Sequence, residues 1–79
     1  MTITVHYFGL LAERRRLTEE RVETIAATAA ELYSKLDADH HLGLEIRDFR
    51  VAVNDEFVAW DYLLQENDSV ALLPPMSGG

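Results

Sequence analysis

The chain of 79 residues contains no cysteine, only two prolines and only four glycines. Without cysteine there is no disulfide bridge, no thiolate metal ligand and no thiol nucleophile. A secreted domain this small usually needs disulfides, and the segment Met1–Thr4 has neither the basic nor the apolar region of a signal peptide. We therefore expect a cytoplasmic protein. No apolar run approaches the roughly 20 residues of a membrane span.

Basic residues are also scarce, seven against fourteen acidic ones, and the formal net charge is −7. Such a chain repels nucleic-acid phosphates and anionic lipid surfaces, so we expect neither as a partner. The charge favours a solubilising surface and also permits steering toward a basic partner surface. Composition alone leaves both interpretations open.

Period-2 alternation predicts the strands. In Thr2–Phe8 the side chains of Ile3, Val5 and Tyr7 share one face of a strand rich in β-branched and aromatic residues. Residues 9–17 are expected to form a connection. Further strands are predicted at Thr18–Ile25, Arg50–Asn54, Phe57–Ala59 and Ser69–Leu73. Segment 44–49 is compatible with a short strand or a helical turn.

One amphipathic helix is predicted after a capping box. The Thr28 hydroxyl is placed to accept from the Glu31 backbone N–H, and the Glu31 side chain to reach back to the Thr28 N–H. The apolar stripe that follows has helical spacing and consists of Ala29, Leu32, Tyr33 and Leu36. The stripe fades in residues 37–41.

The order strand, strand, helix, strand, short strand, strand favours an α+β fold of the β-grasp, ubiquitin-like type. We expect a mixed sheet with its first and last strands parallel at the centre and one main helix packed on one face. The domain then covers residues 1–73. A flexible tail, residues 74–79, projects from the middle of the sheet.

The tail is the most informative segment, because two of the four glycines are its last two residues. At an average glycine content of about 7%, a Gly-Gly end arises by chance roughly once in 200 chains. Glycine lets a chain end thread a narrow channel, since it has no side chain to obstruct it. Pro74 and Pro75 stiffen the base, and the six residues from Pro74 to Gly79 reach about 20 Å when extended. The alternative is an ordinary disordered terminus.

A bare carboxylate must be activated before it can react, and the chain has no nucleotide-binding loop of the Gly-x-x-x-x-Gly-Lys-Ser/Thr or Gly-x-Gly-x-x-Gly type. We therefore expect the chain to be the substrate of activation and no enzyme on its own. Its reactive position is the carboxylate of Gly79 beside Gly78.

The segment Val70–Gly79 resembles the small subunit of molybdopterin synthase, a family of ubiquitin-like sulfur carriers whose members end in a hydrophobic strand, Pro-Pro, two variable residues and Gly-Gly. Asn54, the acidic turn at Asp68 and the opening Val5–Phe8 are also similar to that family. Asn67 stands where the family usually has glycine, and asparagine tolerates a positive φ. Residues 37–49 match nothing diagnostic.

The resemblance implies a function. The Gly79 carboxylate would be adenylated by a ubiquitin-activating-like enzyme, which uses ATP and a sulfur donor, and converted to a thiocarboxylate. The tail would enter the large subunit of molybdopterin synthase and donate sulfur to cyclic pyranopterin monophosphate, in a two-plus-two heterotetramer. The chain itself would bind no cofactor and no metal.

The alternation also predicts a docking surface. If Val70 and Leu72 are core residues, Leu73 points to the helix-free face, together with Phe8 and Phe57. These positions are equally compatible with a core covered by a loop. The residues expected to contact a partner are Phe8, Phe57, Leu73, Pro74, Pro75, Met76 and Ser77.

Two further clusters and three rival functions remain. His40-His41 lacks a third metal ligand, so we interpret it as a solvated loop. Arg14-Arg15-Arg16 is an isolated basic segment for which a solvated loop is favoured, with pairing to acidic neighbours or contact with a partner as the alternatives. The rivals are a sulfur carrier for another pathway such as thiazole synthesis, a protein modifier that forms isopeptide bonds, and a plain interaction module. Carriers for thiazole synthesis generally lack Pro-Pro, so Pro74-Pro75 argues against the first.

Overall fold

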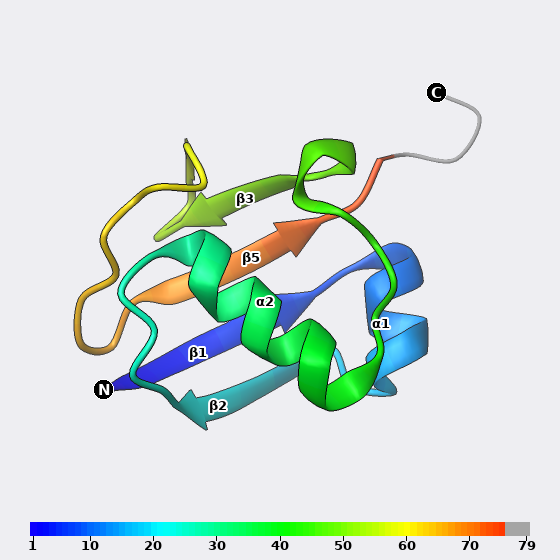
Figure 1. Cartoon of the computed structure of the whole chain (residues 1–79), viewed down its shortest axis with the longest axis horizontal. Helices are drawn as coiled ribbons and strands as arrows, with labels where there is room; N and C mark the ends of the chain where they lie inside the picture. Colours follow the sequence, from blue (N-terminus) through cyan, green and yellow to red (C-terminus); the bar gives the residue numbers. More distant parts are fainter. Residues whose placement is uncertain (76–79) are drawn as a thin grey trace.

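The computed structural model describes residues 1–75 and contains one five-stranded mixed sheet, of strand order β2-β1-β5-β3-β4. Helix α2 crosses one face of this sheet (Figure 1). Strands β1 and β5 are parallel neighbours at the centre, and the other pairs are antiparallel. The elements in chain order are β1 (Thr2–Tyr7), α1 (Gly9–Arg15), β2 (Glu19–Glu23), α2 (Ala29–His40), the 3-10 turn η1 (Ile46–Asp48), β3 (Arg50–Val53), β4 (Glu56–Val58) and β5 (Ser69–Leu73). The predicted β-grasp fold is confirmed.

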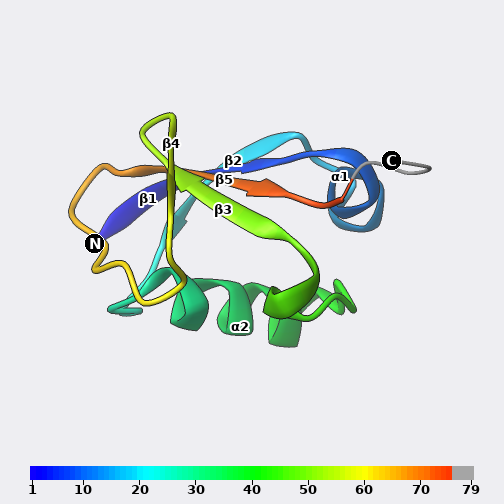
Figure 2. The same ribbon diagram turned by 90° about the horizontal axis from the view of Figure 1, so that it is seen from above.

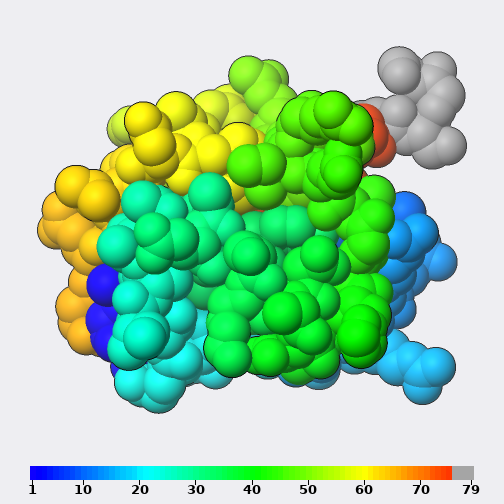
Figure 3. Space-filling model, in the orientation of Figure 1, coloured from blue at the N-terminus to red at the C-terminus, as the bar shows by residue number. Residues whose placement is uncertain are grey.

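The core lies between the sheet and α2. Alternate residues of β1 and β5 face the helix, as their pattern predicts, and the apolar stripe of α2 packs against them. The fully or almost fully buried residues of these three elements are Ile3, Val5, Tyr7, Ala29, Leu32, Tyr33, Leu36, Val70 and Leu72. Figure 2 shows α2 on one side of the sheet only, and Figure 3 shows that α2 and the neighbouring connections together cover that side.

The predicted connection over residues 9–17 is wrong, because it contains helix α1. Phe8 has an extended backbone and precedes the helix, and β1 therefore ends at Tyr7. Leu11 is fully buried and attaches the helix to the core. Arg16, with φ 63°, ends it in the left-handed conformation. A helix of seven residues is marginal in water on its own. Helix α1 therefore depends on the tertiary contact of Leu11, which a local sequence pattern does not reveal.

Helix α2 is longer than its apolar stripe. It begins after Thr28 as predicted and continues through the polar residues to His40. The capping box is half confirmed: the Thr28 hydroxyl accepts from the Glu31 N–H at 3.1 Å. The Glu31 carboxylate accepts from the backbone N–H of Ala27 instead of Thr28, at 3.0 Å. The segment 44–49 contains the helical turn η1 rather than a strand.

The end of the sheet near the amino terminus is held by Asp68, which is buried. Its carboxylate accepts from the Asn54 side-chain amide at 3.0 Å and from the Gln65 backbone N–H at 2.8 Å. Asn54 and Asp55 form the two-residue β3–β4 turn, both with positive φ, as turns of the I′ type require. Asn67 has φ 68°, as its place in the resembled family predicts.

Within residues 1–75, none of the helices combines the length and the apolar character needed to cross a membrane.

Candidate functional site

The root of the tail lies at the end of a central strand. Strand β5 ends at Leu73, where the sequence predicts the boundary of the domain, and Pro74 and Pro75 follow without regular structure. Pro74 packs closely on Gly9: a Cβ on that glycine would lie 3.3 Å from Pro74 Cγ, and its φ of +53° also favours glycine. Gly9 therefore gives the first proline its place against α1.

A groove of about 1060 Å³ surrounds this root. Helix α1 forms one wall, and η1 with the start of β3 forms the other, so that the end of β5 passes between them (Figure 1). Its lining residues are Phe8, Gly9, Leu10, Glu13, Arg47, Asp48, Phe49, Arg50, Phe57, Leu73, Pro74 and Pro75. We call this the tail groove. It contains all five described residues that the sequence assigns to partner binding.

The tail groove leaves large apolar side chains open to solvent. Phe57 is 62% exposed and Phe8 47% exposed, whereas Leu73 is partly buried. The strand register pairs Arg50 with Leu73. The Arg50 guanidinium lies 4.5 Å from the centroid of the Phe57 ring, a cation–π contact. An open apolar surface with a charged rim has the composition of a protein-binding site.

Sequence reasoning did not find the other seven residues that line this groove, and Leu10 and Arg50 show why. Leu10 was assigned to a connection, and only the helical form of α1 turns it toward the tail root. Arg50 was read as a strand residue with no site role. Neighbouring side chains of a strand point to opposite faces of the sheet. Arg50 precedes the buried Val51, and this signal could have placed Arg50 on the helix-free face. Met76, Ser77, Gly78 and Gly79 lie outside the described residues, and their roles stay predictions.

Two of the three consecutive arginines have defined partners, so their interpretation as a solvated loop is wrong. Arg15 donates two hydrogen bonds to the Glu20 carboxylate, both of 2.8 Å. The buried Tyr7 hydroxyl donates to the same carboxylate at 2.7 Å. These bonds, Arg15 first, hold the pKa of Glu20 below its usual range, and burial raises the pKa of Tyr7 above its own. Arg14 donates to the carbonyl oxygen of Leu42. Both contacts fix α1 beside the tail groove.

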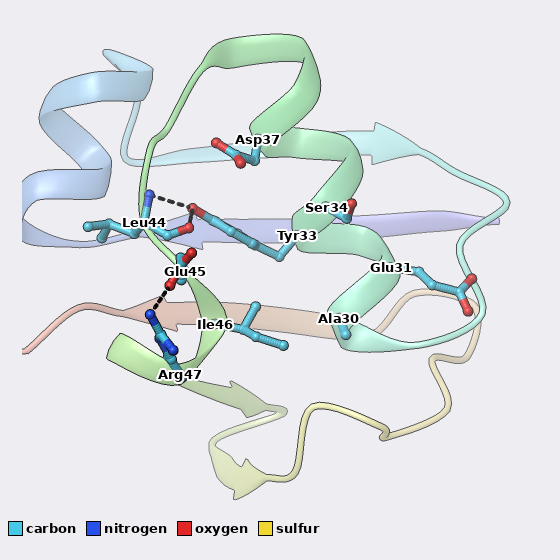
Figure 4. A pocket seen from close by; sticks show the side chains of 9 residues that line it. All are labelled: Ala30, Glu31, Tyr33, Ser34, Asp37, Leu44, Glu45, Ile46 and Arg47. Carbon is cyan, nitrogen blue, oxygen red and sulfur yellow. Dashed lines mark hydrogen bonds and ion pairs between the residues drawn. The ribbon is translucent and has the colours of Figure 1, made fainter.

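A second groove, of about 630 Å³, lies between α2 and the segment before η1 (Figure 4). Several of its polar groups bond within the chain. The Tyr33 hydroxyl donates to the Leu44 carbonyl at 2.7 Å and accepts from its N–H at 3.2 Å. Arg47 pairs with Glu45 at 2.8 Å, and the Asp37 carboxylate accepts from a backbone N–H. We assign this groove to holding the segment on α2.

The structure gives His40-His41 a local role. His40 is the last residue of α2, and His41 ends the helix with φ 54°. Over residues 1–75, no three side chains of the metal-binding types gather into a group that could hold a metal ion.

Comparison with known proteins identifies the family. The family model described as ThiS family matches residues 5–79. Among solved structures, SAMP1 from Haloferax volcanii is 26% identical, with a TM-score of 0.84 over 100% of both chains. A chain of the complex of subunits 1 and 2 of molybdopterin-converting factor from Helicobacter pylori is 25% identical, with a TM-score of 0.69 over 100% of both chains.

A third similar structure is a chain of the BexX/CysO complex from Amycolatopsis orientalis. It is 25% identical, with a TM-score of 0.71, and the match covers 98% of this chain and 99% of that one. Two of the three similar structures are thus protein–protein complexes. The match over residues 5–79, together with the β-grasp sheet and the groove at the root of its last strand, shows that the chain belongs to the ThiS family of ubiquitin-like sulfur carriers.

Proposed function

We propose that this chain is the sulfur-carrying small subunit of a molybdopterin synthase. The observation that carries the proposal is the tail groove, an exposed apolar surface at the root of a Pro-Pro-x-Ser-Gly-Gly end. A partner that docks on Phe8, Phe57 and Leu73 receives the tail at the same time, since Pro74 leaves from the same groove. The Helicobacter pylori relative, solved as a complex of two subunits of molybdopterin-converting factor, supports a partner of this kind.

The chemistry requires two partners in turn. A ubiquitin-activating-like enzyme uses ATP to join AMP to the Gly79 carboxylate, which makes its carbonyl carbon electrophilic. Sulfur from a donor then displaces AMP and leaves a thiocarboxylate. The large subunit of molybdopterin synthase binds the loaded carrier, in a two-plus-two heterotetramer, and the sulfur passes to cyclic pyranopterin monophosphate. This reaction takes place in the cytoplasm, and the chain contributes the carboxylate and binds no cofactor.

Glycine suits both encounters. Gly78 and Gly79 have no Cβ, so two different enzymes can each enclose the end of the chain in a narrow channel. The two prolines limit the conformations of the base, which reduces the entropy lost when the tail is inserted. The conformational cost of insertion then falls mainly on residues 76–79.

A second function is favoured by a specific observation. SAMP1, the small archaeal modifier protein of Haloferax volcanii, resembles this chain over the full length of both. The alternative is therefore a protein modifier whose Gly79 forms isopeptide bonds with lysines of other proteins. Carriage of sulfur for another pathway is a third possibility, and the Pro74-Pro75 pair favours molybdopterin synthesis over thiazole synthesis.

One experiment separates these functions. The purified chain is incubated with an activating enzyme, ATP and a sulfur donor, and its intact mass is measured. Replacement of one oxygen by sulfur at Gly79 supports carriage, whereas conjugates on lysines of added proteins support the modifier. The loaded chain is then mixed with the large subunit and the cyclic precursor, and molybdopterin is assayed. Molybdopterin formation by a chain that lacks Gly78-Gly79 would refute the proposal.

A further inference from the structure

The chain carries its positive charge on two kinds of group that differ in reactivity. Six of its seven basic residues are arginines, and Lys35 is its single lysine. A guanidinium is protonated at any working pH and is not a nucleophile, whereas an amine is an acyl acceptor. The distinction matters to the proposed function, on which this inference rests, because an adenylated Gly79 reacts with amines.

Five of the six arginines lie at the end of the molecule where the tail begins, and Arg21 is on β2. Arg47 and Arg50 line the tail groove together with Pro74 and Pro75. Arg50 is the strand partner of Leu73 in the β3–β5 ladder, so their backbones are about 5 Å apart. Three more arginines lie beside the groove: Arg14 and Arg15 at the end of α1, and Arg16, which caps that helix.

The two amines lie outside the tail groove: Met1 precedes β1, and Lys35 is in the middle of α2. The α-amino group of Met1 and the side chain of Lys35 belong to residues that line one small pocket of about 500 Å³. Figure 1 shows the amino terminus at the far end of β1 from the end of β5. Both groups have partners within the chain: the Met1 α-amino group donates a hydrogen bond to the Thr24 carbonyl at 2.8 Å, and the Lys35 side chain forms an ion pair with Asp39 at 3.4 Å.

The distance from the Met1 amine to the root of the tail exceeds the length of the extended tail. Strands β1 and β5 are parallel with Tyr7 opposite Leu72, which brings Phe8 level with the tail root. The seven steps along the chain from Met1 to Phe8, through the six residues of β1, span about 23 Å. The six residues from Pro74 to Gly79 reach about 20 Å only if they are straight. A folded-back tail therefore falls short of the amine at Met1.

We propose that arginine in place of lysine at positions 47 and 50, which line the tail groove, keeps the activated C-terminus from acylating its own chain. An amine at either position would attack the carbonyl carbon of the Gly79 adenylate. A C–N bond would form, and the bond between the carbonyl carbon and the oxygen of the C–O–P anhydride would break. AMP would leave with the electron pair, and the amine would lose a proton to water. The product is a dead-end cyclic amide. Arginine keeps the positive charge of the groove without that reaction.

The test compares amines placed at the two ends. R50K and R47K introduce an amine in the tail groove, and Q65K introduces one in the exposed loop near the amino terminus. Each variant is adenylated by the activating enzyme and ATP without a sulfur donor, and its mass is followed for the loss of one water molecule. Because a short tether gives an effective concentration in the millimolar range, R50K should cyclise at least roughly tenfold more than Q65K. The wild-type chain should stay linear.

A second route does not depend on the enzyme. Each variant is prepared as a C-terminal thioester by intein cleavage, and cyclisation is measured in the same way. Equal cyclisation of R50K and Q65K thioesters would overturn the inference, as would cyclisation of the wild-type chain at the rate of R50K. Failure of the activating enzyme to adenylate the wild-type chain would instead count against the proposed function, because the thioester experiment still tests the placement of the amines.

Discussion

The sharpest test of the tail groove is Phe57→Ala. Phe57 lies on the edge strand β4 and is 62% exposed, so its removal leaves no cavity in the core. The fold loses the contact between this ring and the Arg50 guanidinium. An exposed cation–π contact contributes about 0.5–1 kcal/mol, and we expect the free energy of unfolding to fall by no more than that.

The expected effect on binding is larger. A phenylalanine side chain buries about 200 Å² when it is fully enclosed, and 62% exposure of Phe57 leaves roughly 120 Å² for a partner to cover. At about 25 cal/mol per Å² this area corresponds to about 3 kcal/mol. If docking buries the whole ring, Phe57→Ala weakens the complex with the large subunit by up to roughly 150-fold. Isothermal titration calorimetry with the purified large subunit measures this change.

Leu63→Ala is the matched control. Leu63 is 67% exposed, close to the value for Phe57, but it lies in the connector between β4 and β5, outside the tail groove. We expect it to change the dissociation constant by less than about twofold. Thermal melts of both variants exclude unfolding as the cause. If Leu63→Ala weakens the complex and Phe57→Ala does not, docking takes place elsewhere and the argument from the groove fails.

Three other substitutions test separate parts of the structure. Leu73→Asp places a carboxylate opposite Arg50, so the fold should survive in a melt while a pull-down with the large subunit fails; retained binding would contradict the groove. Asp68→Ala leaves two donors unpaired at the opposite end, and urea titration should show a loss of about 2–3 kcal/mol with tail activation unchanged. Arg15 lowers the pKa of Glu20, so their pairing stabilises the fold above the usual carboxyl pKa and that stability is lost as the pH falls through the folded value. Glu20→Gln should therefore cost about 1–2 kcal/mol at neutral pH and flatten the acid side of the stability curve, and an unchanged acid side would refute the pairing.

The strands and the main helix were predictable because their signals are local. The alternation of Ile3, Val5 and Tyr7 specifies which face of β1 is buried, whatever lies opposite. The Thr28 hydroxyl caps α2 with a bond that spans three residues. The parallel pairing of β1 with β5 followed from the order of the elements and the single helix.

The walls of the tail groove were not predictable because their signals are not local. Helix α1 is short and has three arginines near its end, which reads as a solvated connection. It persists because Leu11 is buried and because Arg15 binds a glutamate on β2. Arg47 of η1 lines the groove together with Phe57, which the alternation of the strands did predict, ten residues further along the chain. No pattern within either segment shows that the two meet.

The same contacts make α1 the part of the groove most sensitive to acid. Leu11 is its only fully buried side chain, and the pair of Arg15 with Glu20 joins it to β2. Protonation of Glu20 weakens one of the contacts that hold α1, while the strands keep their ladders. Segments with few buried contacts open before the global transition. Hydrogen exchange should therefore show the amides of α1 losing protection at a higher pH than those of β5, and the carrier should lose affinity for the large subunit before it unfolds.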